Sequence, residues 1–116
     1  MRRIFRACVF SWQGLVTTFR DEAAFRQICL LAAVLFPAAC VLADTWTEWV
    51  LLILPVMLCL IVELLNSGIE NCIDRISPEL HPLSKKAKDQ GSAAQFLAQI
   101  FLVTVWCAWL AHYFWG

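Results

Sequence analysis

The sequence predicts an all-α membrane protein in which one amphipathic surface helix precedes three transmembrane helices. Three observations lead to this fold class: 61% of the 116 residues are hydrophobic, only 16% are charged, and the apolar residues fall into three long runs. Soluble domains rarely have this composition, so a membrane is the expected solvent. The formal net charge is zero, which gives no basic excess that would indicate nucleic acid as a partner.

The surface helix is predicted at residues 1–25. Apolar side chains recur there every three or four residues from Ile4 to Phe19, with Arg2 and Arg20 among the polar side chains between them. Trp and Phe side chains beside several arginines suit a helix that lies in the headgroup region of a membrane. A helix packed on a soluble partner is the alternative interpretation.

The first transmembrane helix is predicted at residues 27–44. No charged residue occurs between Arg26 and Asp44, and this length approaches the roughly 20 residues that a helix needs to cross hydrocarbon. Pro37 lies inside the segment, where neighbouring helices can tolerate the kink it causes. The short acidic and aromatic stretch at residues 44–48 predicts an interfacial hairpin turn.

The second and third transmembrane helices are predicted at residues 49–69 and 91–115. The uncharged run Trp49–Val62 covers only about 21 Å of a hydrocarbon core of about 30 Å. The second helix must therefore continue through Glu63 and Asn66, which places a carboxyl and an amide inside the bilayer boundary. The third segment carries no formal charge. Its C-terminal end has the aromatic residues of an interface belt, namely Trp106, Trp109, Tyr113 and Trp115.

The positions of the basic residues predict the orientation in the membrane. All nine Lys and Arg residues lie before the first span or between the second and the third. By the positive-inside rule, the N-terminus and the loop predicted at residues 74–89 are cytoplasmic and the C-terminus is outside.

A stripe of polar side chains lies at the cytoplasmic end of the second span. Glu63, Asn66, Glu70 and Asp74 are separated by three, four and four residues, so they project from one face of a helix. A carboxylate inside a membrane costs about 3 kcal/mol even on lenient scales, and it therefore indicates a functional site. Ion pairing across helices, or a solvated helix end, is the structural alternative, and it suits Asp74 best.

Carboxylates that offer only oxygen ligands suit Mg²⁺, which commonly bridges protein carboxylates to substrate phosphates. Glu22 lies near the same membrane depth as Glu70, where it would either complete the metal site or be an ordinary exposed residue. No P-loop motif and no protein-kinase signature occurs in the sequence. Any nucleotide site must therefore be of another kind.

The basic segment before the third span is a candidate phosphate-binding region. Lys85, Lys86 and Lys88 precede Asp89 and follow His81, so cationic groups would lie beside the metal. For Lys85 and Lys86 a simple topology signal is the preferred interpretation.

Three blocks of sequence resemble the bacterial prokaryotic diacylglycerol kinase family: Glu22–Gln27, Glu63–Arg75 and Lys88–Ala94. The resemblance covers nearly the whole chain, and the blocks occur in the order typical of the family. It implies a homotrimer that transfers the γ-phosphoryl group of ATP to diacylglycerol and forms phosphatidic acid. It also implies composite sites between subunits in the bacterial cytoplasmic (inner) membrane.

The resemblance implies roles for residues at matching positions. Glu63 would be the general base toward the lipid hydroxyl, with Asn66 as a catalytic support, and Glu22 and Glu70 would bind Mg²⁺. The implied ATP-binding residues are Arg3, Phe10, Glu22, Glu70, Glu79, Leu80, His81, Lys88 and Asp89. The implied lipid-substrate residues are Ala7, Cys8, Ser11, Trp12, Phe25, Arg26, Glu63, Ser92, Trp106 and Trp109. At Phe10 the family is expected to carry a tyrosine, so a hydroxyl contact with ATP is missing there.

Three other functions compete with diacylglycerol phosphorylation. An undecaprenol kinase would share the catalytic frame but accept a polyprenyl alcohol, and the blocks around Asp74–Ser77 and Gly91–Ala94 favour diacylglycerol. A small multidrug or ion transporter usually needs four spans and a carboxylate near the middle of the membrane. A non-catalytic assembly subunit would keep its function in cells after Glu63→Gln.

Overall fold

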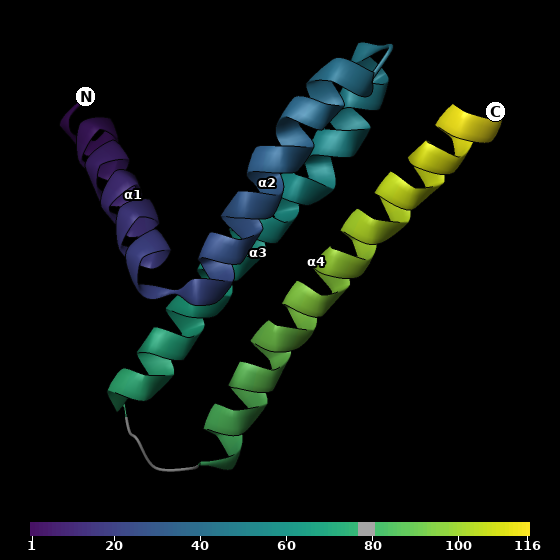
Figure 1. The fold of residues 1–116 in the computed structure, drawn as a ribbon. Coiled ribbons are helices and arrows are strands. Elements are labelled where there is room, and N and C mark those ends of the chain that lie inside the picture. The colour runs from purple at the N-terminus through teal and green to yellow at the C-terminus, as the bar shows by residue number, and fades with distance from the viewer. Residues whose placement is uncertain (77–80) are drawn as a thin grey trace.

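Four helices make up the computed structural model, which describes residues 1–76 and 81–116 (Figure 1). They are α1 (Arg2–Asp21), α2 (Ala23–Leu42), α3 (Trp46–Ile76) and α4 (Pro82–Trp115). Helices α2, α3 and α4 are each long and apolar enough to cross a membrane. The predicted all-helical fold with three candidate spans is thereby confirmed.

Helix α3 is the centre of the fold. Both α2 and α4 pack on it, whereas α2 and α4 do not contact each other within the described part of the chain. Helix α4 runs antiparallel to α3, and both extend well past the start of α2 at the end where residues 77–80 join them (Figure 1). One chain therefore forms an open row of three spans rather than a closed bundle.

The long helices α3 and α4 correct the predicted cytoplasmic loop at residues 74–89. Helix α3 continues to Ile76 and α4 begins at Pro82, while residues 77–80 lie outside the described part of the chain. At 31 and 34 residues, the two helices are about 46 and 51 Å long, which exceeds a hydrocarbon core of about 30 Å. The prediction ended each helix near the expected membrane boundary, at residues 69 and 91, but charged residues do not terminate a helix.

Ion pairs accompany this helical extension. Lys88 Nζ donates to Asp74 Oδ1 across the two helices at 2.8 Å, and Lys85 Nζ donates to Asp89 Oδ2 within α4, also at 2.8 Å. The second pair has the i, i+4 spacing that supports a helix. The charged residues at the ends of α3 and α4 can therefore belong to a helix that extends into water, and they do not require a loop.

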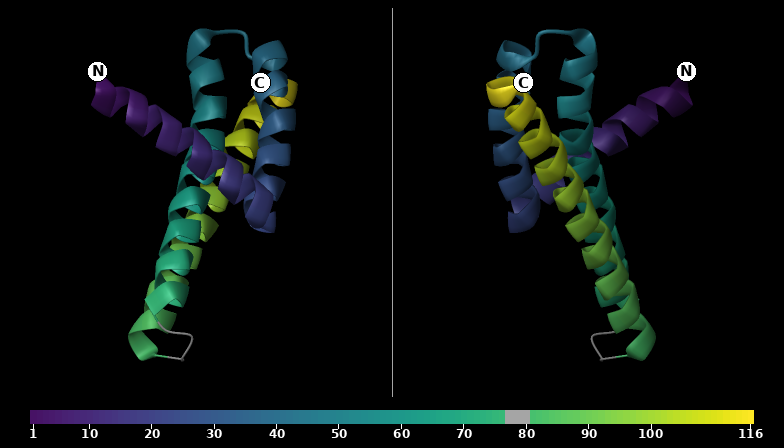
Figure 2. Two further views of the ribbon diagram at one scale, coloured as in Figure 1. Left: turned by 90° about the vertical axis from the view of Figure 1, so that its left-hand side faces the viewer. Right: turned by 90° about the vertical axis from the view of Figure 1, so that its right-hand side faces the viewer.

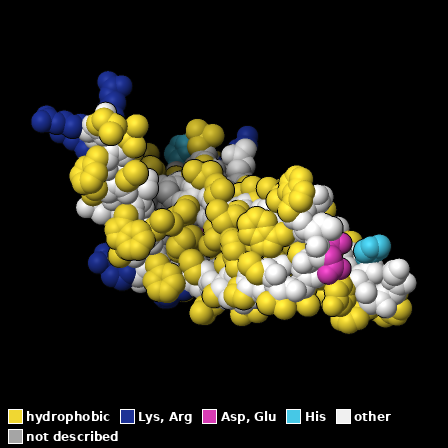
Figure 3. All heavy atoms as spheres, turned by 90° about the horizontal axis from the view of Figure 1, so that it is seen from above, with side chains coloured by type: hydrophobic (Ala, Val, Ile, Leu, Met, Phe, Trp, Pro, Cys, Tyr) yellow, Lys and Arg dark blue, Asp and Glu magenta, His cyan; other side chains and the backbone are white. Residues whose placement is uncertain are grey.

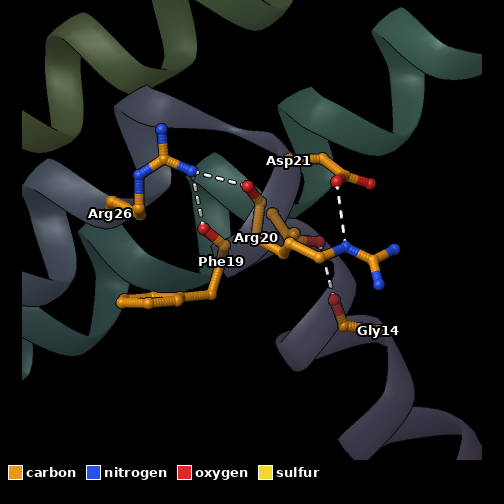
Figure 4. Close-up of polar contacts among 6 residues, drawn as sticks. Gly14, Phe19, Arg20, Asp21 and Arg26 are labelled. Atoms are coloured by element: carbon orange, nitrogen blue, oxygen red, sulfur yellow. Dashed lines mark hydrogen bonds and ion pairs between the residues drawn. The ribbon is translucent and has the colours of Figure 1, made fainter.

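The chain bends at Glu22, so the predicted surface helix ends earlier than residue 25. Glu22 has an extended backbone conformation between α1 and α2, with φ −113° and ψ 111°. Arg26 Nη1 donates to the carbonyl oxygens of Phe19 at 3.0 Å and Arg20 at 2.7 Å (Figure 4). These bonds satisfy carbonyl groups that the end of a helix leaves free, and they fix the bend. Phe25 consequently belongs to α2, where it is buried.

Helix α1 leaves this bend obliquely and crosses α3 (Figure 2), with contacts to both α2 and α3. Every large apolar side chain along it is exposed, including Phe5 and Trp12. Figure 3 shows a surface that is largely hydrophobic, with most visible Lys and Arg side chains on the side that carries α1. Placement of α1 in the headgroup layer stays a prediction.

The apolar core lies along α3, between it and its neighbours α2 and α4, on the half of the hairpin away from residues 77–80. Leu52, Val56 and Cys59 of α3 are almost completely buried there. Trp106 is 8% exposed and its Nε1 donates to the carbonyl oxygen of Leu52 at 3.0 Å. Trp109 is also buried, at 9% exposed.

The burial of these two tryptophans corrects their assignment to an aromatic interface belt. Both rings pack into the core because they cover a large apolar area there, and the indole N–H of Trp106 finds a carbonyl partner. Tyr113 and Trp115, nearer the C-terminus, are exposed and remain suited to a membrane interface.

Candidate functional site

A polar cavity of about 370 Å³ lies where the start of α2 faces α3 and α4. The bend at Glu22 brings the first turn of α2 to the middle of the longer α3 helix (Figure 1). Eight polar side chains line the cavity: Glu22 and Gln27 at the start of α2, Glu63, Asn66 and Glu70 on α3, and Ser92, Gln95 and Gln99 on α4.

Three of the four residues in the predicted stripe line this cavity. Glu63 is only 6% exposed and Asn66 only 8%, whereas Glu70 is half-buried. Asp74 does not line the cavity, because the helix carries it further along, where it pairs with Lys88. The structural alternative for Asp74, an ion pair across helices, is the arrangement in the structure.

Asn66 is held between Glu70 and Gly91. Its Nδ2 donates to Glu70 Oε1 at 3.4 Å, which is longer than a strong hydrogen bond. Its Oδ1 is buried and has no hydrogen-bond partner. A Cβ atom at Gly91 would collide with this same Oδ1, so the glycine permits the close approach of α4 to the Asn66 amide. The amide oxygen therefore lies against Gly91 without a hydrogen-bond partner among residues 1–76 and 81–116.

The carboxylates of Glu22, Glu63 and Glu70 all line this one cavity. Within residues 1–76 and 81–116, no three acidic, His or Cys side chains form a ready cluster of metal ligands. Mg²⁺ does not require one, because it usually takes one or two protein carboxylates and completes its octahedron with phosphate oxygens and water. The all-oxygen set of Glu22 and Glu70, beside the unpaired oxygen of Asn66, fits such an ion.

Of the predicted ATP-binding residues that the structure describes, only Glu22 and Glu70 line the cavity of a single chain. Lys88 and Asp89 are engaged with Asp74 and Lys85. The remaining predictions divide as follows: Arg3 and Phe10 are exposed on α1, His81 accepts a hydrogen bond from Leu83 N at the start of α4, and Glu79 and Leu80 lie outside the described residues.

A separate apolar groove of about 680 Å³ lies between α1, α2 and α3. Trp12 and Phe25, two of the predicted lipid-substrate residues, line it together with Leu60 and Leu64. The other predictions for lipid contact are spread over the fold. Ala7, Cys8 and Ser11 are exposed on α1, Arg26 holds the bend, Ser92 lines the polar cavity, and Trp106 and Trp109 belong to the core.

The structure adds cavity residues that the sequence predictions missed, namely Gln27, Gln95 and Gln99. A single glutamine in an apolar run gives little signal. The spacing of Ser92, Gln95 and Gln99, which are three and four residues apart, does place them on one face of a helix. This second polar stripe, opposite the first, was the available signal.

The sequence also matches known proteins over nearly its whole length. Residues 9–110 match the profile of the family described as prokaryotic diacylglycerol kinase. The chain belongs to this family. The predicted resemblance is therefore confirmed, and so is the prediction that the protein is an enzyme, a lipid kinase.

Relatives from several bacteria support this membership. A diacylglycerol kinase from Pseudomonas aeruginosa is 51% identical over 106 residues, which cover 91% of this chain and 86% of the relative. The diacylglycerol kinase of Escherichia coli is 48% identical over 114 residues, covering 97% and 92%. One from Helicobacter pylori is 46% identical over 109 residues, covering 94% and 85%.

Proposed function

We propose that this chain phosphorylates diacylglycerol in the bacterial inner membrane, taking the γ-phosphoryl group of ATP and forming phosphatidic acid. The observation that carries the proposal is the position of Glu63. Its carboxyl is buried in a polar cavity, and no ion pair involves it within the described part of the chain. A buried carboxylate without a structural partner is a candidate for proton transfer.

The apolar groove supports an acceptor with long hydrocarbon chains. Glu63 and Leu64 are neighbours on α3, yet Glu63 lines the polar cavity and Leu64 lines the groove. Consecutive residues of a helix point about 100° apart, so the two spaces lie on different faces of α3 at the same depth. A diacylglycerol bound here would keep its acyl chains in the apolar groove while its hydroxyl group reaches Glu63.

Glu63 would act as the general base in this reaction. As the lipid hydroxyl oxygen attacks the γ-phosphorus of ATP, its proton passes to the Glu63 carboxylate. A new oxygen–phosphorus bond forms, and the bond between that phosphorus and the oxygen of departing ADP breaks. Phosphoryl transfer depends mainly on alignment and charge stabilisation, so no covalent enzyme intermediate is required.

Asn66 and Glu70 would align the reacting groups. Glu70 accepts the Asn66 amide N–H and so orients Oδ1, the unpaired oxygen held against Gly91. Glu22 and Glu70 would hold Mg²⁺, which when bound supplies positive charge to the phosphate oxygens. Lys88 would exchange its partner Asp74 for a phosphate of ATP, a change between two charge-assisted hydrogen bonds.

We further propose that the site is completed between subunits of a homotrimer. Helices α2 and α4 both line the cavity without packing on each other, so a second copy can close it and bring its own nucleotide-binding residues. The number three rests on the family resemblance alone. The N-terminus and the ends of α3 and α4 next to residues 77–80 would face the cytoplasm, because every Lys and Arg residue lies either at or before Arg26 or between Arg75 and Lys88.

An assay with two competing lipids tests the proposed function. Purified protein in mixed micelles receives labelled ATP, Mg²⁺, diacylglycerol and undecaprenol. We expect labelled phosphatidic acid as the main product, and no product when Mg²⁺ is chelated. Exclusive labelling of undecaprenol would show that the acceptor is wrong, and the absence of any labelled lipid would contradict the kinase reaction itself.

A further inference from the structure

The polar cavity contains one buried polar side chain for which the proposed reaction has no role. Gln95 of α4 is 7% exposed, and within the described part of the chain neither its amide nitrogen nor its amide oxygen has a hydrogen-bond partner. The other buried amide, Asn66, has at least its contact with Glu70. A buried amide without partners is unfavourable, because it has given up its hydrogen bonds to water without replacing them.

The register of α3 and α4 places Gln95 level with Glu63. Gly91 lies against Asn66, and the two helices are antiparallel (Figure 1). Gln95 is four residues after Gly91 on α4. It therefore lies opposite the residue four positions before Asn66 on α3, which is Val62, the neighbour of Glu63. At about 1.5 Å per residue, Gln95 and Glu63 lie at nearly the same depth.

The chemistry of the cavity leaves the Gln95 amide nitrogen free for a ligand. The carboxylates that line this cavity are those of Glu22, Glu63 and Glu70, and all of them offer hydrogen-bond acceptors when ionised. Gln95 Nε2 is a buried donor among these acceptors, yet it bonds to none of them. It therefore suits an acceptor oxygen that arrives with the substrate.

We propose that Gln95 positions the acceptor lipid by donating a hydrogen bond from Nε2 to an ester carbonyl oxygen beside the reacting hydroxyl. This inference rests on the proposed function and deepens it. In diacylglycerol an ester carbonyl lies a few bonds from the free hydroxyl, which matches two side chains at equal depth in one cavity. Gln95 thus distinguishes ester-linked lipids from acceptors that offer a hydroxyl alone.

An ester and an ether substrate provide the test. We would measure KM for a short-chain diacylglycerol and for the dialkylglycerol with the same chains, whose ether oxygens are weak acceptors. Loss of one neutral hydrogen bond corresponds to roughly a five- to tenfold change in affinity. The wild-type enzyme should therefore show about that much higher KM for the ether lipid.

In Gln95→Leu this preference should disappear. KM for the ester lipid should rise roughly five- to tenfold, while KM for the ether lipid and KM for ATP should stay unchanged. Gln95→Met keeps the side-chain length without the amide and should behave in the same way if Gln95→Leu fails to fold. Gln90→Leu removes an exposed amide of α4 outside the cavity and should retain the ester preference.

Three outcomes would overturn the proposal for Gln95: an equal rise of KM for both lipids, no change for either, or loss of oligomer assembly in both Gln95 variants. Each of them leaves a wild-type enzyme that phosphorylates diacylglycerol. Failure of the proposed function differs clearly, because the wild-type protein would then give no phosphatidic acid at all.

Discussion

The two halves of the α3–α4 hairpin are built from the same helices but differ in how their polar groups are satisfied. In the half that contains Leu52 and Trp106, the core is apolar and its buried indole N–H has a carbonyl partner at 3.0 Å. In the half that contains Glu63 and Gln95, buried polar atoms lie around a cavity and several have no partner. We call these the apolar half and the polar half.

The difference indicates what each half is for. A fully packed and satisfied core contributes to stability, because the helices gain close van der Waals contact and no polar group is left unpaired. Unpaired buried groups have an energetic cost that substrates can offset when they bind. Substitutions in the apolar half should therefore lower stability more than catalytic activity. Substitutions in the polar half should lower catalytic activity more than stability.

Glu63→Gln should have the largest effect on catalysis. The amide is similar in size to the carboxylate but cannot accept the hydroxyl proton, so we expect kcat to fall by about 10²- to 10⁴-fold. Folding, oligomer assembly and ATP binding should be preserved, which size-exclusion chromatography and nucleotide titration can check. Wild-type turnover in this variant would remove Glu63 from its role as the base.

Gly91→Ala should disturb the polar half through packing. The new Cβ would collide with Asn66 Oδ1, so the amide must move, and a displacement of this kind can lower kcat roughly ten- to hundredfold. Gly68→Ala is the matched control, because a Cβ atom there meets nothing within 4 Å and alanine favours a helix. Equal kcat values for the two variants would argue against close positioning of Asn66.

Glu70→Gln should weaken the response to Mg²⁺. Loss of one carboxylate ligand should raise the Mg²⁺ concentration that gives half-maximal activity by about tenfold. Asp74→Asn removes the next carboxylate of the stripe, which is paired with Lys88 outside the cavity, and should leave this concentration unchanged. If Glu70→Gln and the wild type reach half-maximal activity at the same Mg²⁺ concentration, Glu70 is not a metal ligand.

Trp106→Phe should lower the stability of the apolar half, which is the smallest of the four expected effects. It leaves the carbonyl of Leu52 without its indole donor and should lower the free energy of unfolding by about 1 to 2 kcal/mol. Trp115→Phe, at an exposed position, should change it far less. Thermal unfolding in detergent measures both variants, and an equal, negligible change would contradict the structural role of Trp106.

Much of this arrangement follows from the sequence because its signals are local. The stripe from Glu63 to Glu70 is visible from helical spacing alone, and three apolar segments indicate three spans. The lengths of α3 and α4 do not follow in the same way. Hydropathy reports where a helix leaves the membrane, whereas a helix ends only where its backbone hydrogen bonds end.

Other features depend on packing between distant segments, which a sequence does not display. No proline or glycine adjoins Glu22, so the sequence gives no sign of the bend. The bend is fixed by hydrogen bonds from Arg26 to carbonyl groups of α1. Trp106 has the composition of an interface residue, but its partner Leu52 lies 54 positions away in the sequence. Gln95 comes to lie in the same cavity as Glu63 only because α4 packs against α3.

The central claim is that the polar half performs catalysis and the apolar half maintains the fold. It is tested most directly by the initial rate of phosphatidic acid formation from equal amounts of folded Glu63→Gln and Trp106→Phe protein, at saturating ATP and diacylglycerol. We predict a rate near that of the wild type for Trp106→Phe and almost no product for Glu63→Gln. Similar rates for the two variants would contradict the claim.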